Sequence, residues 1–475
     1  MIRGKVGRLL LILTSAAVML SGCSSAVKPN SEQSTKEMSN LKLDSSIKYQ
    51  EIEGFGASGA WWSQDIGGWP DEKRSKILDL LFDKEKGIGL NIYRYNVGAG
   101  EGHSIQDAWR KSESFEVSKG KYDWSKDANA VKVMKEAVNR GVNNIVFFAN
   151  SPTARMTVSG RVTGENTGQS NLKKDMYADF SDYLIDVSKH FIEEEKLPVK
   201  WISPINEPEW DWQESKGQEG CHYTPEECRE FLKVFVGKLK ESGINAKTSA
   251  GELGQWSDVT SYMKTILEDE GLRKELSPFA IHSYWSDRTS KVIANQFLKT
   301  TFSDTKLWMS EWTEMQGGRD TGMDSALTMA EVINDDLTIG SVTSWQYWIA
   351  VSKYDYRDGL IYTDEGKQNV IETKRLWVLG NYSKFIDPGF TRINVESENE
   401  DLKVSAFTDG NKKTVIVAVN NSKETVQTKL NTTNTFNSSK IYETSDKKNL
   451  EEVYSGKAKD TYEFTPKSVT TIVLE

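Results

Sequence analysis

The sequence contains few of the residues that build metal sites and disulfide bonds. Of its 475 residues only 3 are cysteine and 4 are histidine. The histidines, at positions 103, 190, 222 and 282, stand alone, and the spacing of Cys221 and Cys228 fits no zinc pattern. We therefore expect no metal site and no cofactor. In an exported protein these two cysteines are compatible with a local disulfide, and two free thiols are an equal alternative.

The body of the chain also lacks a block of basic residues. Its formal net charge is −9, from 60 Lys and Arg against 69 Asp and Glu. Because phosphate binding requires a footprint of lysine and arginine, we expect no nucleic-acid partner. Charged residues make up 27% and hydrophobic residues 37%, as is typical of soluble globular proteins. The length suggests two or three domains, although a single α/β barrel takes about 250 residues or more.

A long apolar run is missing as well, since LLLILTSAAVML at residues 9–20 is too short to span a bilayer comfortably. It follows Arg3, Lys5 and Arg8 and leads into Leu20-Ser21-Gly22-Cys23. This arrangement resembles the bacterial lipoprotein signal, in which residues 1–22 would be removed and Cys23 would carry the lipid. The alternative is an ordinary secretory signal with a chance cysteine. Both predict export, and the first predicts a lipid-anchored protein at the bacterial cell surface that meets the membrane through its anchor only.

The chain from residue 52 to 385 alternates short β-like runs with longer helical patterns. The strand-like runs start near residues 52, 88, 143, 201, 245, 278, 306 and 341. Between them, residues 171–191 place apolar side chains at helical spacing, and Thr224 to Glu227 has the form of a capping box with Pro225 at the first helical position. Eight such units predict an α/β fold, a (β/α)8 TIM barrel.

The segments before and after this region differ from it in composition and in residue pattern. Residues 23–42 are rich in Ser, Lys and Glu and predict a flexible tether. Residues 386–475 alternate polar and apolar positions between turns, which predicts a small antiparallel β-sandwich side domain. Residues 43–51 form a strand-like run that we expect to join this side domain.

Polar side chains stand at the predicted C-terminal ends of the strands, where barrel enzymes carry their catalytic groups. The run WISPINEP ends in Asn206-Glu207-Pro208, where we expect Pro208 to stop the strand and present Glu207 at the rim. Glu311 ends the seventh run. Two carboxyl groups about 5 Å apart hydrolyse a glycosidic bond with retention of configuration. Further strand-end residues are Arg94, Asn96, Asn150, His282, Tyr284, Trp345 and Trp348.

The ordered set EGFGASGAWW, IYRYNVGAG, SPINEPEWDW, QEGCHYTPEE, IHSYW, WMSEW and DYRDGLIY resembles glycoside hydrolase family 30. The resemblance covers residues 43 to 475 and implies a barrel joined to a side β domain. It implies Glu207 as general acid/base and Glu311 as nucleophile, with no metal. It also implies a substrate site that contains Arg94, Asn150, Asn206, Trp61, His282, Tyr284, Trp345 and Trp348.

Each assignment has a structural alternative. Arg94 could serve only as an ion-pair partner, His282 could be a packed core histidine, and the tryptophans could all be packing groups. Glu209, Glu252 and Glu314 also stand near strand ends, where we expect rim or supporting roles. After Asn150 the family usually shows an aromatic residue that this chain replaces with Thr153-Ala154-Arg155, so an aromatic wall is missing from one subsite.

Within the family, QEGCHYTPEE and DYRDGLIY are most similar to the endo-β-1,6-galactanase branch, which implies arabinogalactan side chains as substrate. Alternatives of the same family are xylanase, β-1,6-glucanase and glucosylceramidase. An alternative of another class is an inactive glycan-binding surface lipoprotein. We expect a monomer.

Overall fold

The structure is a computed structural model that describes residues 38–100 and 103–475. The predicted signal peptide, the lipidation site Cys23 and the tether up to residue 37 lie outside the described residues. Within these residues, none of the helices combines the length and the apolar character needed to cross a membrane.

Eight parallel strands form a closed barrel. In sheet order they are β2 (Gly54–Ser58), β3 (Ile92–Asn96), β6 (Asn144–Phe148), β7 (Val199–Ser203), β8 (Lys247–Leu253), β9 (Leu276–His282), β10 (Leu307–Glu311) and β11 (Ser344–Ser352). Pairing of β10 with β11 and of β11 with β2 closes the ring. Each of the eight overlaps one of the predicted runs, so the predicted barrel is confirmed, although β7 and β9 begin before their runs and β11 extends beyond its run. The short strands β12 (Gly359–Tyr362) and β13 (Ile371–Glu372) extend the sheet beyond β11.

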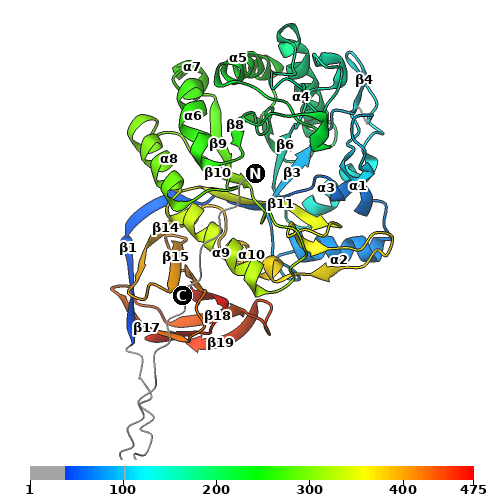
Figure 1. Ribbon diagram of the computed structural model, residues 1–475. Coiled ribbons are helices and arrows are strands. Elements are labelled where there is room, and N and C mark those ends of the chain that lie inside the picture. Colours follow the sequence, from blue (N-terminus) through cyan, green and yellow to red (C-terminus); the bar gives the residue numbers. More distant parts are fainter. Residues whose placement is uncertain (1–37, 101–102) are drawn as a thin grey trace, which may run out of the picture. The chain divides into compact units, whose positions relative to one another are not determined.

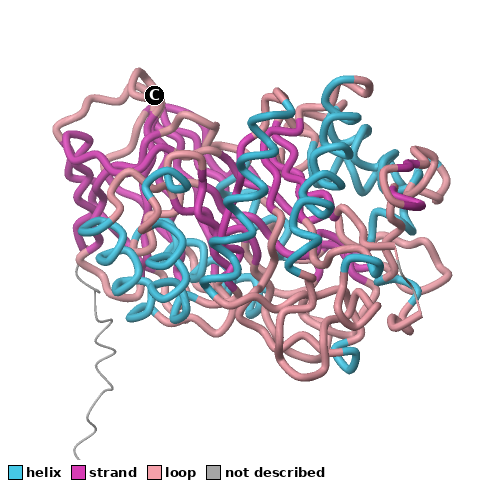
Figure 2. The backbone as a smooth tube through the Cα atoms, turned by 90° about the horizontal axis from the view of Figure 1, so that it is seen from above, coloured by secondary structure: helices cyan, strands magenta, loops and turns pink. Residues whose placement is uncertain are grey.

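Helices flank the barrel strands (Figure 2). They are α1 (Trp62–Ile66), α2 (Asp71–Phe82), α3 (Ala128–Val138), α4 (Tyr177–Glu193), α5 (Pro225–Ser242), α6 (Val259–Leu267), α7 (Glu270–Arg273), α8 (Arg288–Thr301), α9 (Met323–Thr338) and α10 (Lys374–Ser383). Short 3-10 turns are η1 (Ala108–Arg110), η2 (Ala154–Met156), η3 (Lys174–Met176), η4 (Glu214–Lys216) and η5 (Trp256–Asp258), and β4 (Glu116–Ser118) and β5 (Lys121–Tyr122) form a small hairpin.

The start of helix α5 follows from a local sequence signal, and the start of helix α4 follows from a contact with another segment. The predicted capping box is confirmed, because Thr224 Oγ1 accepts the Glu227 N–H at 3.2 Å and Glu227 Oε2 accepts the Thr224 N–H at 3.0 Å. The helix predicted over 171–191 begins only at Tyr177. Leu172 instead forms a bridge with Thr157, which holds the preceding segment in an extended form.

The side domain is a nine-stranded sheet with a core of its own. Its strands are β1 (Ser39–Glu51), β14 (Thr391–Ser397), β15 (Leu402–Thr408), β16 (Thr414–Asn420), β17 (Val426–Thr432), β18 (Ser438–Thr444), β19 (Glu451–Lys457), β20 (Thr461–Phe464) and β21 (Ser468–Leu474). The long strand β1 lies between β14 and β17, and Figure 1 shows it in blue along the domain. It begins at Ser39, inside the segment predicted to be tether, and its pairing with β17 is parallel in an otherwise antiparallel sheet.

The side domain packs against the last two barrel helices. Helix α9 contacts β15, β16 and β21, and α10 contacts β18 and β21. At this contact Asn381 of α10 is fully buried, donates to Thr471 Oγ1 at 2.9 Å and accepts from Thr444 Oγ1 at 2.6 Å. The side domain therefore fixes the helices that lie next to β10 and β11.

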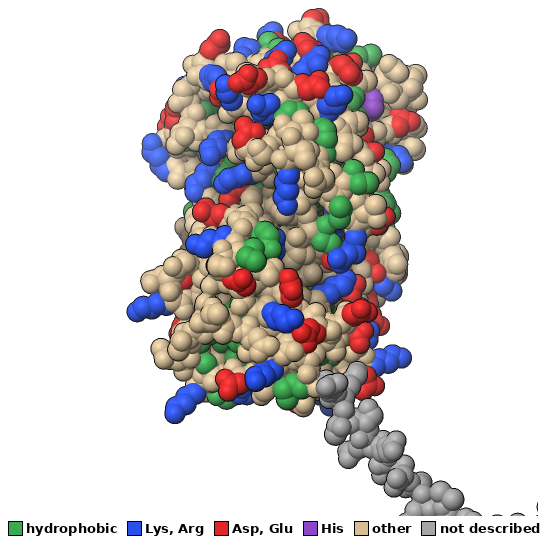
Figure 3. All heavy atoms as spheres, turned by 90° about the vertical axis from the view of Figure 1, so that its left-hand side faces the viewer, with side chains coloured by type: hydrophobic (Ala, Val, Ile, Leu, Met, Phe, Trp, Pro, Cys, Tyr) green, Lys and Arg blue, Asp and Glu red, His purple; other side chains and the backbone are tan. Residues whose placement is uncertain are grey.

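The molecular face drawn in Figure 3 carries acidic and basic side chains interspersed, with small separate groups of hydrophobic side chains. This face therefore has no large patch of a single charge.

Candidate active site

The loop after β7 carries Glu207 in a left-handed backbone conformation. Strand β7 ends at Ser203, so Pro204 and not Pro208 interrupts the ladder, because Pro204 has no N–H to donate. Glu207 has φ 43° and its N–H donates to the Glu252 carbonyl at 2.8 Å. Such a conformation costs about 1–3 kcal/mol in a non-glycine residue and concentrates at functional sites.

Glu207 and Glu311 converge at the mouth of the barrel. Glu311 is the last residue of β10 and is 4% exposed, and Glu207 is 9% exposed. A carboxylate oxygen of each and a ring nitrogen of His282 all lie within 4.8 Å of one another. Two glutamates that are more than a hundred positions apart in the sequence thus meet around one point, as predicted.

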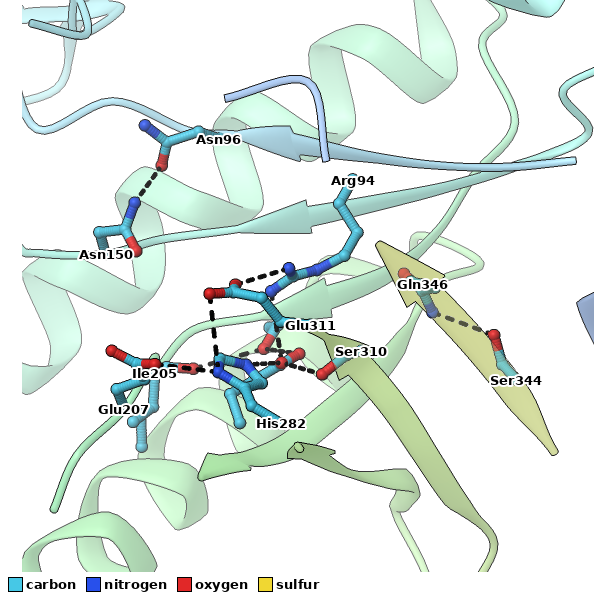
Figure 4. A network of polar contacts seen from close by, with 12 residues as sticks. Arg94, Asn96, Asn150, Ile205, Glu207, His282, Ser310, Glu311, Ser344 and Gln346 are labelled. Carbon is cyan, nitrogen blue, oxygen red and sulfur yellow. Dashed lines mark hydrogen bonds and ion pairs between the residues drawn. The ribbon is translucent and has the colours of Figure 1, made fainter. Parts of the chain in front are cut away.

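A network of buried charges holds these carboxylates (Figure 4). Arg94 Nη1 donates to Glu311 Oε2 at 2.9 Å, and its Nη2 donates to Glu252 Oε2 at 3.3 Å. His282 bridges Glu207 and Glu252, with 3.1 Å from Nδ1 to Glu207 Oε1 and 3.1 Å from Nε2 to Glu252 Oε2. Tyr284 Oη donates to Glu311 Oε1 at 3.0 Å. Arg94 and His282 are fully buried, so they orient the glutamates.

The surroundings drive the protonation states of these groups apart. Burial raises the pKa of Glu207 above its usual range, against the opposing effect of His282. Burial alone would raise the pKa of Glu252 too, but Arg94 and His282 outweigh it and lower the pKa to about 2. For His282, burial is outweighed by Glu311, Glu207 and Glu252, which raise its pKa to about 10. At neutral pH these shifts favour an ionised Glu252 and a protonated His282, and they make Glu207 retain its proton more readily than an exposed glutamate.

Glu207, His282 and Glu311 together present the set of ligand atoms that a metal ion would need. A protonated imidazole, however, donates from both nitrogens and has no lone pair to offer. The guanidinium of Arg94 also lies against Glu311. The trio is therefore better suited to proton transfer than to holding a cation.

Above the glutamates lies a cleft of about 590 Å³. The predicted site residues that line it are Trp61, Asn150, Asn206, Glu207, Tyr284, Glu311 and Trp348. Trp61 and Trp348 meet edge to face with ring centroids 5.2 Å apart. The Oδ1 atom of Asn206 is buried without a hydrogen-bond partner among the described residues. Buried polar atoms are normally paired, so this oxygen is available to a ligand.

Comparison with known proteins identifies the family. A model described as O-Glycosyl hydrolase family 30 matches residues 38–279 and 289–362, and the family 30 beta sandwich domain matches residues 389–472. The chain belongs to glycoside hydrolase family 30. It is thus an O-glycosyl hydrolase, and the predicted resemblance is confirmed.

Named relatives of this family 30 hydrolase have different substrates. It is 24% identical to an endo-beta-1,6-galactanase of Hypocrea rufa, over 82% of each chain. It is also 24% identical to glucuronoxylanase XynC of Bacillus subtilis, over 87% of this chain and 83% of the relative. A conserved exported protein from Bacteroides fragilis has a crystal structure that superposes with a TM-score of 0.83 at 30% identity, over 91% of this chain and 100% of that one.

Trp345 does not line the cleft of this family 30 hydrolase, contrary to our prediction. It is fully buried, and its indole N–H donates to Asp336 Oδ2 of α9 at 3.0 Å. Successive strand residues point to opposite faces, so Trp345 of β11 faces the helices while Gln346 bonds Ser344 on the other face. Arg94 and His282 also do not line the cleft, since they contact the glutamates from within the barrel.

Several cleft residues were not singled out from the sequence. They are Arg110, Lys216, Gln218, Thr313, Met315, Tyr354, Asp355, Tyr356 and Asp358. Four of them follow β11 in the stretch that includes DYRDGLIY, so the motif itself was the available signal. Trp210, Trp212 and Trp285 also line the cleft, and Trp285 is 61% exposed.

The remaining candidates serve as supports. Glu252 lies in the charge network described above, and Glu314 accepts from Arg357 Nη1 at 2.8 Å. Burial raises the pKa of Glu209 to about 8, and its carboxyl accepts the Gly254 N–H. Arg155, one of the residues that we predicted to replace an aromatic wall, pairs with Glu116 at 2.7 Å and with Asp179 at 2.8 Å. Cys221 and Cys228 are buried free thiols, which removes the disulfide alternative.

Proposed function

We propose that the protein is a retaining endo-β-1,6-galactanase that cleaves arabinogalactan side chains through a covalent glycosyl-enzyme intermediate. The observation that carries the retaining assignment is the approach of the Glu207 and Glu311 carboxylates to within 4.8 Å. Retaining enzymes hold their two carboxyl groups about 5–5.5 Å apart, whereas inverting enzymes leave about 6.5–9.5 Å for a water molecule.

The environments of the two glutamates support different roles for them. Glu207, whose pKa is raised by burial, donates its proton to the glycosidic oxygen as the leaving group departs. Glu311 accepts hydrogen bonds from Arg94 and Tyr284, and its carboxylate attacks the anomeric carbon. In the second step Glu207 takes a proton from water, the water oxygen bonds to the anomeric carbon, and the ester bond to Glu311 breaks.

Neighbouring groups position the sugar for this reaction. Asn206 presents an unpaired oxygen that can accept a hydrogen bond from the sugar 2-hydroxyl. Trp61 and Trp348 provide aromatic surface for the apolar face of the ring. Asn150 lines the same cleft and is oriented by Asn96, since Asn150 Nδ2 donates to Asn96 Oδ1 at 3.2 Å.

The similarity to the endo-β-1,6-galactanase over most of both chains supports the choice of substrate. A glucuronoxylanase has the same sequence identity to this chain, 24%, as the galactanase does. Xylan is therefore the main alternative substrate within the family, beside β-1,6-glucan and glucosylceramide. Two sugars that differ in one hydroxyl can be discriminated by a single hydrogen bond in a loop. Product analysis must therefore decide between them.

The test is hydrolysis of β-1,6-galactan, β-1,6-glucan and glucuronoxylan, with products resolved by length and the anomeric configuration followed by NMR. We expect a ladder of galactan oligosaccharides whose new reducing ends first appear in the β form. Products from xylan alone would overturn the substrate assignment, and α anomers would overturn retention. Binding of a glycan without hydrolysis would favour an inactive surface receptor.

We further propose that the protein is exported and tethered through lipid on Cys23. The sequence LSGC at residues 20–23 and the similarity to a protein described as exported support this. Wild type should fractionate with membranes and incorporate labelled palmitate, and Cys23→Ala should do neither. Soluble, unlabelled wild-type protein would contradict the anchor.

A further inference from the structure

A second hollow of about 470 Å³ adjoins the cleft. We call it the side hollow, and its wall includes Trp61, Trp69, Trp109, Lys353 and Thr363. Trp61 lines both spaces, so the two spaces meet at this residue. Along the chain, Trp109 is followed by Arg110 and Lys353 by Tyr354, and the second residue of each pair lines the cleft. The two spaces are therefore adjacent at three places along the chain: at Trp61, at Trp109-Arg110 and at Lys353-Tyr354.

The wall of the side hollow combines aromatic surface with unpaired polar atoms. Three of its residues are tryptophans that are 5 to 8% exposed, and indole surface suits the apolar face of a sugar ring. The indole Nε1 of Trp109 and the hydroxyl of Thr363 are buried without a partner among the described residues. Buried polar atoms are nearly always hydrogen-bonded, so both could bond to hydroxyl groups of a ligand.

The charges around the side hollow are mainly acidic. Asp65, Asp364 and Glu365 line it, with Lys353 as the one basic residue in its lining. That lysine is already engaged, since its Nζ lies 3.1 Å from Glu365 Oε1 and 3.8 Å from Asp107 Oδ1. Asp364 also pairs with Arg319 Nη1 at 2.8 Å and with Lys367 Nζ at 3.4 Å, which leaves Asp65 as the lining carboxylate without an ion pair among the described residues. A carboxylate on the ligand would meet repulsion from Asp65, whereas a hydroxyl group can donate to it.

We propose that the side hollow is a second carbohydrate-binding site, which takes an uncharged glycosyl unit of the same chain that is cleaved at Glu207 and Glu311. This inference rests on the proposed glycan hydrolase function and adds a preference for neutral chains long enough to pass Trp61. Long neutral oligosaccharides gain binding energy from the side hollow, and short ones do not reach it.

Ala108→Trp tests this by filling the side hollow. Ala108 lines it and is exposed, so a larger side chain can be accommodated without disturbing the core. Gln106→Trp is the matched control, because Gln106 is also exposed and is absent from the lining of both spaces. Neither residue belongs to the catalytic centre. Thermal unfolding of both variants checks that they fold as wild type does.

The measurement is kcat/KM on β-1,6-galactan oligosaccharides from the shortest that wild type cleaves up to the hexaose. We expect wild type and Gln106→Trp to gain about tenfold with length, which corresponds to ~1.4 kcal/mol. Ala108→Trp should lose this gain while keeping the rate on the shortest substrate. A full length-dependent gain in Ala108→Trp would overturn the inference.

Other outcomes separate this inference from the proposed function. If wild type cleaves only β-1,6-glucan or xylan, the galactan assignment fails, and the same pair of variants tests the side hollow on oligosaccharides of that glycan. If wild type cleaves none of the three, the hydrolase proposal and this inference fall together.

The preference for neutral units has its own readout. Wild type should cleave an oligosaccharide with a terminal glucuronate more slowly than its neutral counterpart. We divide the rate on the neutral oligosaccharide by the rate on the glucuronate-bearing one. The double variant Asp65→Asn, Glu365→Gln should lower this ratio about threefold, as expected for partly exposed charges. An unchanged ratio would overturn the charge argument.

Discussion

The mouth of the barrel buries charged side chains, whereas the core of the side domain buries apolar ones. At the mouth, Arg94, Glu252, His282 and Glu311 are nearly inaccessible and are joined by hydrogen bonds. The side-domain core is apolar, with members such as Leu41, Ile393, Ile416, Ile472 and Leu474. Burial of apolar surface stabilises by about 25 cal/mol per Å², whereas a buried ion pair barely offsets its own desolvation. The comparison indicates that the mouth is built for chemistry and the side domain for stability.

The largest effect should follow from Glu311→Gln. The amide keeps the shape of the side chain but cannot attack the anomeric carbon, so kcat should fall on the order of 10⁴-fold on whichever glycan wild type cleaves. Glu443→Gln is the matched control, because Glu443 is also a buried glutamate but lies in the side domain, 3.0 Å from Lys448. Equal losses in both variants would remove the distinction between the two regions.

An intermediate effect should separate stability from activity. Ile416→Ala in β16 removes a fully buried side chain from the side-domain core and should lower the free energy of unfolding by ~2–5 kcal/mol. Below the unfolding transition, kcat/KM should stay at the wild-type value. Ile281→Ala in β9 removes an equally buried side chain next to His282 and should lower both quantities. Denaturant titration and initial rates provide the two readouts, and full activity in Ile281→Ala would contradict the assignment.

The barrel and the meeting of Glu207 and Glu311 at its mouth could be predicted because both depend on local patterns. Buried parallel strands appear in the sequence as short apolar runs, and the C-terminal ends of the barrel strands meet at the mouth of the barrel. Glu207 and Glu311 were found in this way. The strand end itself was misplaced, since Pro204 interrupts the ladder of β7 before Pro208 is reached.

What could not be predicted depends on side-chain direction and on long-range pairing. Trp345 and Trp348 both belong to β11, but the alternation of the strand turns Trp345 toward α9, and only Trp348 reaches the cleft. Glu252 resembled any other strand-end glutamate. Its role follows from the charges of Arg94 and His282, which come from two other strands and converge only in the folded barrel.

The smallest effect is a pH dependence of stability that only the mouth should contribute. The surrounding carboxylates raise the pKa of His282 to about 10 in the folded protein, above the ordinary histidine value of 6.5, so His282 binds its proton more tightly when folded. Its contribution to stability is complete below pH 6.5 and is lost as the pH rises toward 10, with a slope of at most ~1.4 kcal/mol per pH unit. His282→Gln should be less stable than wild type at neutral pH and should lack this part of the slope. Since Ile416 itself carries no titratable group, Ile416→Ala should keep the wild-type slope at a lower absolute stability. Parallel slopes for wild type and His282→Gln in denaturant titrations from pH 7 to 9 would show that the charges at the mouth do not hold His282 in its protonated form.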